Sequence, residues 1–250
     1  MSATSTVLIT GCSSGFGLDT ARLFLEKGWH VVATMRTPRD DLLPRSDSLR
    51  VLSLDVTDAE SIRRCVEQAG PLDALVNNAG IGLLVTLEGL VMASVREVFE
   101  ANALGTMAMT QAVLPQMRER RAGVIVNATS SVTLRPLPLL SVYTGSKAAV
   151  NAFTESLALE LAPFHVRARL VLPGRAPNTR FGDNARRLMQ GSGHPAYAEF
   201  MQRVFAGVRD TRSPVTHAQD VAEAVWRAVT DPAAPMRIAA GADAVTLASA

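Results

Sequence analysis

The stretch Thr10-Gly11-Cys12-Ser13-Ser14-Gly15-Phe16-Gly17 decides the fold. It follows an apolar run, Val7–Thr10, that predicts a strand, and it opens a helical pattern from Gly15 to about Lys27. Glycines allow a tight turn and a close backbone approach, and a helix N-terminus offers unpaired N–H groups to an anion. A glycine-rich turn alone is a weak signal. Between a strand and a helix, it predicts a site for the phosphates of a dinucleotide.

The rest of the chain repeats this alternation of strand and helix. Further strand patterns cover 31–34, 51–54, 74–76, 123–127, 166–172 and 236–239, and helical patterns cover 59–69, 94–121, 143–161 and 218–230. Such alternation predicts an α/β fold with a doubly wound, Rossmann-type parallel sheet and helices on both faces. Ligands of these sheets bind at the carboxyl ends of the strands. We expect one domain over residues 1–250.

The segment 175–214 breaks this rhythm. It is rich in proline and glycine and shows no strand pattern. Long irregular insertions in compact domains are often functional, so we expect a substrate-binding lid within the domain. The tail 242–250 is expected to be loosely held.

Composition excludes several other classes of protein. The formal charge of +2 is too small to indicate a nucleic-acid or membrane-surface partner. The two cysteines have no paired spacing and the four histidines are scattered, so we expect no disulfide and no metal site. We find neither a secretory signal pattern nor an apolar run of about 18 residues. The expectation is a cytoplasmic protein with a small-molecule substrate.

Tyr143 and Lys147 form the candidate catalytic pair. Residues i and i+4 share one face of a helix, so both side chains can reach one site. A free tyrosine titrates near pH 10, and a neighbouring ammonium lowers its pKa. The spacing therefore predicts that Tyr143 exchanges a proton with a substrate oxygen.

Five motifs, in order, resemble the classical short-chain dehydrogenase/reductase (SDR) family. They are the glycine-rich loop, Asn77-Asn78-Ala79-Gly80, the helix asparagine Asn102, Tyr143-x-x-x-Lys147 and Pro173-Gly174. The resemblance implies hydride transfer between a nicotinamide cofactor and a carbonyl or secondary alcohol, with Lys147 also holding the nicotinamide ribose. It further implies a homodimer or homotetramer, assembled through the helices of 94–121 and 143–161.

The resemblance also assigns a serine and an asparagine. The family's serine lies thirteen residues before the tyrosine and three after an asparagine that ends the fifth strand; both counts lead to Ser130 rather than Ser131. Its hydroxyl would bind the substrate oxygen. Asn102 would support a water path to Lys147, although a buried helix asparagine that satisfies backbone groups is the competing interpretation.

The residues expected to hold the cofactor come mostly from strand ends. They are Gly11, Ser13, Ser14, Gly15, Phe16, Gly17, Arg36, Asp55, Val56, Asn77, Ala79, Gly80, Tyr143, Lys147, Pro173 and Gly174. Asp55 could instead cap the following helix. Gly80 would leave room for the adenosine ribose.

The end of the second strand favours NADP(H) over NAD(H). Met35 stands where NAD-binding members carry an acid, and Arg36 follows as a fixed cation that can pair with a 2′-phosphate. Arg36 could also be a solvated surface residue. The family's second basic anchor is absent, because Ser14 occupies that position.

The substrate region departs most from the family pattern. A threonine near the nicotinamide amide is replaced by Asn178, with Thr179 one residue further, and Gly145 costs the catalytic helix about 1 kcal/mol relative to alanine. Apolar residues predict a largely apolar substrate or simply pack the lid: Leu137, Pro138, Leu139, Leu140, Phe181, Leu188, Met189, Tyr197, Phe200, Met201 and Phe205. Arg180, Arg186 and Arg187 could bind an acidic substrate or lie in solvent. The rival functions are a non-catalytic NAD(P) sensor on the same fold and a lyase or epimerase of the extended branch.

Overall fold

The computed structural model describes residues 4–177, 179, 185, 188–189, 192–208 and 214–249. Within these residues, seven parallel strands form one sheet in the order β3-β2-β1-β4-β5-β6-β7. The strands are β1 (Thr6–Ile9), β2 (His30–Met35), β3 (Leu49–Ser53), β4 (Ala74–Asn77), β5 (Gly123–Ala128), β6 (Val166–Pro173) and β7 (Arg237–Ala240). The chain starts in the middle of the sheet and builds outward in both directions, which confirms the doubly wound, Rossmann-type prediction.

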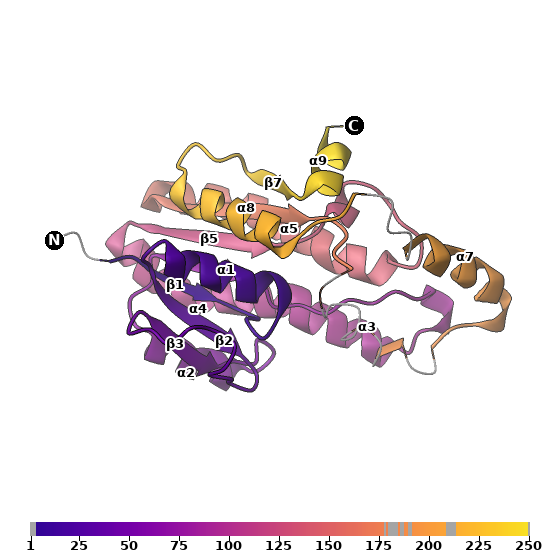
Figure 1. Ribbon diagram of the computed structural model, residues 1–250, viewed down its shortest axis with the longest axis horizontal. Helices are drawn as coiled ribbons and strands as arrows, with labels where there is room; N and C mark the ends of the chain where they lie inside the picture. Colours follow the sequence, from indigo (N-terminus) through magenta and orange to yellow (C-terminus); the bar gives the residue numbers. More distant parts are fainter. Residues whose placement is uncertain are drawn as a thin grey trace.

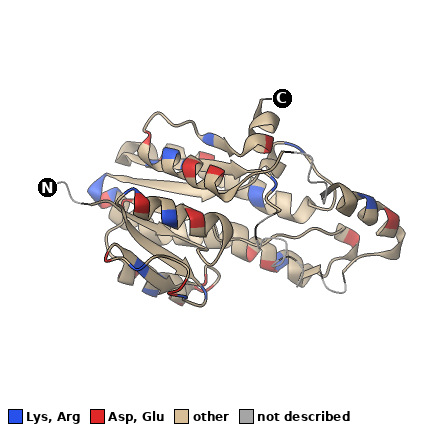
Figure 2. Cartoon of the chain, in the orientation of Figure 1, with Lys and Arg blue, Asp and Glu red and all other residues tan. Residues whose placement is uncertain are grey.

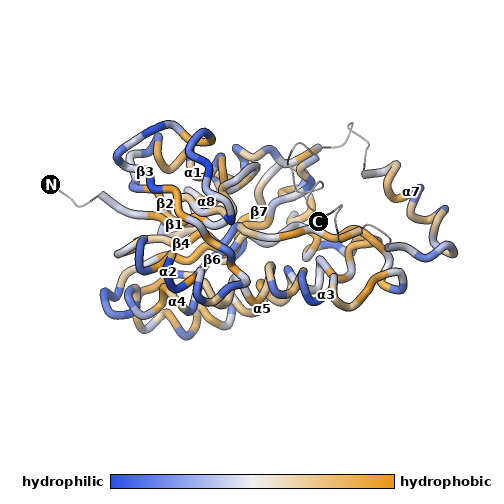
Figure 3. Tube along the Cα trace, turned by 90° about the horizontal axis from the view of Figure 1, so that it is seen from below, coloured by the Kyte–Doolittle hydropathy of each residue, from blue (hydrophilic) through white to orange (hydrophobic). Residues whose placement is uncertain are grey.

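Helices cover both faces of the sheet, as Figures 1 and 3 show. α1 (Gly15–Glu26) and α8 (Ala218–Thr230) cover one face, and α2 (Ala59–Ala69), α4 (Gly105–Arg120) and α5 (Ser141–Leu161) cover the other. The central strands are therefore buried on both sides and carry almost only apolar residues. Figure 2 shows basic and acidic residues interspersed over α1 and α8, in keeping with the small net charge.

Shorter elements lie mainly at the carboxyl end of the sheet. They are η1 (Leu87–Gly89), α3 (Met92–Phe99), a π-helix, η2 (Glu100–Leu104), η3 (Ser131–Thr133), η4 (Ala162–Phe164), η5 (Pro195–Tyr197), α7 (Ala198–Val208) and α9 (Ala242–Ala248). α7 lies at the end of the molecule far from the N-terminus (Figure 1). The segment 175–214 thus contains a helix of its own and, in its described part, no strand. The expected loose tail is wrong, because α9 buries Ala244 and hydrogen-bonds through Asp243.

Three aromatic rings join α1 to α8 near the amino ends of the strands. Phe24 contacts Trp29 and Trp226 edge-on, with ring centroids 5.2 and 5.1 Å away. The two indoles lie 6.0 Å apart, and the Lys27 ammonium lies over the Trp226 ring. Such pairs add stability beyond the area they bury, so this cluster holds the two helices together.

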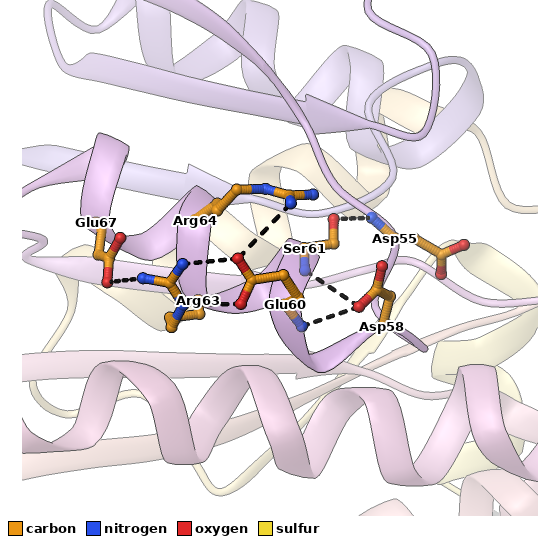
Figure 4. A network of polar contacts seen from close by, with 7 residues as sticks. All are labelled: Asp55, Asp58, Glu60, Ser61, Arg63, Arg64 and Glu67. Carbon is orange, nitrogen blue, oxygen red and sulfur yellow. Dashed lines mark hydrogen bonds and ion pairs between the residues drawn. The ribbon is translucent and has the colours of Figure 1, made fainter.

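Asp58 caps α2, and the loop before it is fixed to the helix (Figure 4). The Asp58 carboxylate accepts hydrogen bonds from the N–H groups of Glu60 and Ser61. The Ser61 hydroxyl accepts the Asp55 N–H at 3.0 Å. The alternative that Asp55 caps this helix is therefore wrong. Asp55 instead accepts the N–H and hydroxyl of Thr57, which keeps its carboxylate at the carboxyl end of β3.

Candidate active site

A cavity of about 460 Å³ opens at the carboxyl ends of the strands. Most residues expected to hold a cofactor line it: Gly11, Ser13, Ser14, Gly15, Phe16, Arg36, Asp55, Val56, Ala79, Gly80, Tyr143, Lys147 and Pro173. The lining also includes residues that the sequence analysis did not assign to the cofactor: Met35, Leu54, Thr57, Asn78, Ile81, Glu97, Ala101, Ala128 and Thr129. The structure thus brings motifs from six separate parts of the chain to one hollow.

The glycine-rich loop is clamped by the side chain of Asn78. Its amide Nδ2 donates to the Thr10 carbonyl at 2.9 Å and to the Gly11 carbonyl at 3.3 Å. A Cβ on Gly17 would lie 2.5 Å from that nitrogen, and Gly11 has a φ of +76°. Gly17 does not line the cavity. Its role is to let Asn78 approach, and a strand-end asparagine directly after Asn77 was the signal for this contact.

Asn77 points away from the cavity and into the protein. Its Nδ2 donates to the Thr110 hydroxyl at 3.1 Å and to Asn127 Oδ1 at 2.9 Å. Asn127 in turn donates to Thr154 at 2.8 Å. This buried network ties β4 and β5 to α4 and α5, and of the two asparagines only Asn78 lines the cavity. Gly174 does not line the cavity either.

Tyr143 and Lys147 lie buried on one face of α5. The Lys147 ammonium donates to the Ala128 carbonyl at 2.9 Å, and burial lowers its pKa to about 8. Burial raises the pKa of Tyr143 to about 12, and a hydrogen bond with Ser130 partly offsets this rise. The expected lowering of the Tyr143 pKa is therefore not produced by the chain's own groups, because desolvation of the phenolate outweighs them.

Ser130, the serine to which both counts along the sequence led, is hydrogen-bonded to Tyr143. It caps η3 by accepting the Val132 N–H at 3.3 Å, and its Oγ lies 3.5 Å from the Pro173 carbonyl oxygen. The neighbouring Thr129 also lines the cavity. Its buried hydroxyl has no hydrogen-bond partner among the described residues, and a buried hydroxyl without a partner is costly.

Asn102 lies within the π-helix η2, a distortion that often marks functional sites. Its Oδ1 accepts the Ile81 N–H at 2.8 Å, and its Nδ2 donates to the Ile81 carbonyl and to Ser146. The bonds to Ile81 satisfy backbone groups, as the alternative of a purely structural asparagine expects. A Cβ on Gly80 would lie 2.9 Å from Asn102 Oδ1 and 3.4 Å from Lys147 Nζ. Gly80 therefore leaves open the space beside Asn102 and Lys147, and it lines the cavity.

The end of β2 presents a cation to the cavity. Arg36 is exposed and lines the cavity, whereas its neighbour Met35 is buried beside it. Hydrogen bonds from Thr57 lower the pKa of Asp55, and the charge of Arg36 adds to that lowering. Asp55 and Arg36 thus face the same end of the hollow.

The apolar residues of the lid pack mostly against the body in the part that the structure describes. Leu188 is buried against Leu83, Val85 and Val98, and Met189 and Met201 join that cluster. Leu139 has a φ of +64°, and its carbonyl accepts the Val85 N–H at 2.9 Å. Tyr197 and Phe205 are partly buried, and Leu137 and Phe200 are exposed. Asn178, Arg180, Phe181, Arg186 and Arg187 lie outside the described residues; Thr179 lines the cavity.

A dinucleotide cofactor fits the residues of this cavity. Gly11 and Gly15 of the loop line the cavity without a side chain, and α1 begins there after the extended residue Ser14. The unpartnered Thr129 hydroxyl offers a hydrogen bond at the opposite end. Among the described residues, no cluster of histidine, cysteine or acidic side chains could hold a metal ion. None of the helices described is long and apolar enough to span a membrane.

Comparison with known proteins gives one consistent answer. The family model for short chain dehydrogenases matches residues 5–188. The chain is 36% identical over 240 residues to 3-ketodihydrosphingosine reductase of Bacteroides thetaiotaomicron, which covers 94% of this chain and 87% of that protein.

Solved structures agree with this assignment. A short-chain dehydrogenase from Streptomyces avermitilis superposes with a TM-score of 0.83 at 31% identity, covering 100% of this chain and 92% of that one. One from Burkholderia cenocepacia, in complex with NADP, has a TM-score of 0.79 at 25% identity and covers 98% and 92%. The chain belongs to the short-chain dehydrogenase family and is an oxidoreductase that acts on CH–OH or C=O groups.

Proposed function

We propose that this oxidoreductase interconverts a largely apolar ketone and its secondary alcohol, with NADP(H) as the preferred cofactor and Tyr143 as the proton donor and acceptor. One observation carries the proposal. Tyr143, hydrogen-bonded to Ser130 and one helical turn from Lys147, opens on the same cavity as the glycine loop. Hydride and proton transfer need the proton donor and the cofactor to share one cavity.

The residues that would hold the cofactor divide the cavity into two ends. The N–H groups at the start of α1, from Ser13 to Phe16, would bind the pyrophosphate. Asp55 and Val56 would bind the adenine end, and Lys147 and Thr129 the nicotinamide end. When bound, the nicotinamide supplies or accepts the hydride.

The chain's own residues would handle the proton and the developing charge. Because its pKa lies near 12, Tyr143 is protonated at neutral pH and can donate to a carbonyl oxygen during reduction. The Ser130 hydroxyl would stabilise negative charge on that oxygen. The Lys147 ammonium would stabilise the phenolate that remains, and Asn102 would connect Lys147 to solvent through water.

Replacing Tyr143 with phenylalanine tests this assignment. We expect Tyr143→Phe to keep NADPH affinity and to lose at least about a hundredfold in kcat, the usual range for a general acid. The matched control is Tyr197→Phe, at the chain's other tyrosine, which does not line the cavity. Turnover of Tyr143→Phe comparable with that of the control would refute Tyr143 as the proton donor.

The preference for NADP(H) rests on Arg36 and Met35. A guanidinium binds a phosphate well, and an acid that would repel the 2′-phosphate is absent from the end of β2. We expect Arg36→Asp to lower kcat/KM for NADPH about tenfold or more and to leave that for NADH higher than before. Arg39→Asp is the control, since Arg39 does not line the cavity. An unchanged NADPH/NADH ratio would remove Arg36 from the cofactor site.

The apolar substrate is supported by the ketone named for the Bacteroides relative. The described apolar residues of the lid pack mostly against the body. A series of ketones of increasing alkyl length, assayed with NADPH, tests it. We expect kcat/KM to rise with chain length, because each buried CH₂ contributes about 0.8 kcal/mol. NADPH binding without turnover across the series would favour the rival sensor function.

We further propose a homodimer or homotetramer assembled through α4 and α5. An apolar groove between these helices is lined by Leu104, Met107, Leu114, Phe153 and Leu157, and Leu104 is 49% exposed. Exposed apolar grooves often mark interfaces. Light scattering on the wild type and on Leu104→Asp tests this: we expect the variant to be smaller in mass, and a monomeric wild type would refute it.

A further inference from the structure

One carboxylate joins both ends of the segment between β6 and α8. Asp243, in the first turn of α9, accepts the Arg175 N–H through Oδ2 at 2.6 Å and the Thr216 hydroxyl through Oδ1 at 2.7 Å. Arg175 is the second residue of this segment and Thr216 the second from its end. We call Gly174, Arg175, Thr216 and Asp243 the clasp.

The backbone closes the clasp from the other side. The Gly174 N–H donates to the Thr216 hydroxyl oxygen at 2.9 Å, and the Thr216 N–H donates to the Arg175 carbonyl at 2.8 Å. Thr216 is only 3% exposed, so water does not compete freely for these groups. The two ends are therefore paired with each other as well as with Asp243.

Two glycines make the close approach possible. A Cβ on Gly174 would overlap the Asp243 carboxylate, and a Cβ on Gly241 would overlap the Thr216 hydroxyl. Gly241 also has a φ of +94°, a conformation that other residues rarely adopt. The Pro-Gly turn after β6 and the glycine before α9 thus serve one contact.

Pro173 connects the clasp to Ser130 and Tyr143. Pro173 precedes Gly174 and lines the cavity, and its carbonyl oxygen lies 3.5 Å from Ser130 Oγ. Ser130 in turn bonds Tyr143. A shift of the strand end would therefore move both a wall of the cavity and a neighbour of the serine.

We infer that Asp243 is a positioning residue of this oxidoreductase: by binding Arg175 and Thr216 it fixes Pro173 against the cavity and Ser130. The inference rests on the proposed role of Ser130. The clasp needs a hydrogen-bonding side chain and not a charge. Asparagine can accept from the Arg175 N–H and donate to Thr216 Oγ, whose proton then goes to the Ala240 carbonyl 2.9 Å away.

Two matched pairs of variants test the inference: Asp243→Ala with Asp243→Asn, and Thr216→Val with Thr216→Ser. Hydrogen exchange of peptides covering 173–177 and 214–217 measures the clasp itself. We expect faster exchange at both ends in Asp243→Ala and Thr216→Val, and near wild-type exchange in the conservative partners. In the same two disruptive variants we expect kcat to fall about tenfold, because the freed strand end displaces Pro173 and Ser130, while the NADPH Kd stays within about threefold.

The alternatives give different patterns. Faster exchange with unchanged kcat in Asp243→Ala would show that the clasp is structural only and would overturn the inference. An equal loss of kcat in Asp243→Asn and Asp243→Ala would point to the charge instead and would also overturn it. Should Asp243→Ala not fold, the Thr216 pair carries the same comparison. If wild-type protein binds NADPH but reduces no ketone, the proposed function fails, and exchange alone decides whether Asp243 joins the two ends.

Discussion

The glycine loop after β1 and the Pro-Gly turn after β6 are built alike and serve opposite purposes. In both turns, a glycine leaves room for a polar side chain from a distant part of the chain. The hydrogen-bonded residues are 67 apart for Gly11 and Asn78, and 68 apart for Arg175 and Asp243. Asn78 binds backbone carbonyls, whereas Asp243 binds a backbone N–H. The Asn78 contact leaves the N–H groups of the glycine loop available to a phosphate. The Asp243 contact occupies the N–H of Arg175 in the Pro-Gly turn.

The difference shows how two turns at the carboxyl end of one sheet can serve either to bind an anion or to hold the backbone in place. An anion site needs donors that the protein does not satisfy internally, so the side chain that clamps such a loop has to take its acceptors. A turn that only has to hold its place does better with its donors engaged, since buried unpaired N–H groups are costly. The identity of the clamping residue, amide or carboxylate, therefore indicates which purpose a glycine turn serves.

The largest expected effect is a loss of NADPH affinity when the contact between Asn78 and the glycine loop is disturbed. Gly17→Ala would place a Cβ 2.5 Å from Asn78 Nδ2 and from the Gly11 carbonyl oxygen. We expect the NADPH Kd to rise about a hundredfold, because displacing the loop loses several phosphate hydrogen bonds.

Gly145→Ala is the control, since its Cβ would meet Phe99 at an ordinary 3.6 Å. It should raise the free energy of unfolding by up to about 1 kcal/mol through helix propensity. Fluorescence titration with NADPH and thermal melts measure both variants. Equal NADPH affinity of Gly17→Ala and wild type would show that the Asn78 clamp does not shape the phosphate site.

An intermediate effect is expected at the clasp. Gly174→Ala pushes a Cβ into the Asp243 carboxylate, and we expect a loss of roughly 2 kcal/mol in the free energy of unfolding, a typical overpacking cost. Asp243→Ala removes the obstacle. The double variant should therefore lose less than the sum of the two single variants, as measured by urea unfolding. Additive losses would mean that Gly174 and Asp243 do not share one contact.

The smallest effect concerns charge and pH. Burial lowers the Lys147 pKa from its ordinary 10.5 to about 8, and Tyr143 titrates well above that. Lys147 loses its proton as pH rises through about 8, so we expect kcat/KM for ketone reduction to fall above that pH. Between about 8 and 10.5 the unfolded chain holds this proton more tightly, so the lysine's cost to folding is relieved as pH rises.

Asp243→Asn should leave this alkaline limb in place, within about 0.3 pH units, because desolvation is the cause of the Lys147 shift. A larger displacement of the limb would mean that the clasp acts through its charge and is not a purely geometric device.

The sequence predicted most of the fold because its signals are local. Period and turn residues mark α2 (Ala59–Ala69) and α8 (Ala218–Thr230) at the bounds that the structure has. Tyr143 and Lys147 were placed by helical spacing, and Ser130 by two counts from fixed positions.

The remaining features depend on contacts between distant residues. Asn77 and Asn78 look alike in the sequence, and only the position of α4 decides that Asn77 faces inward, toward Thr110. The chain's own groups do not lower the Tyr143 pKa, because burial raises it and the depth of burial is not visible in a motif. Asp243 belongs to no motif at all, so its contacts with Arg175 and Thr216 appear only in three dimensions.

The aromatic cluster between α1 and α8 gives the protein an optical signal that is separate from that of a nicotinamide cofactor. Both of its tryptophans, Trp29 and Trp226, lie in that cluster near the amino ends of the strands, at the opposite edge of the sheet from the cavity. Indole emission will therefore report chiefly whether α1 and α8 remain packed together. Reduced nicotinamide bound in the cavity would emit at longer wavelength, so unfolding and cofactor release could be followed separately in one cuvette.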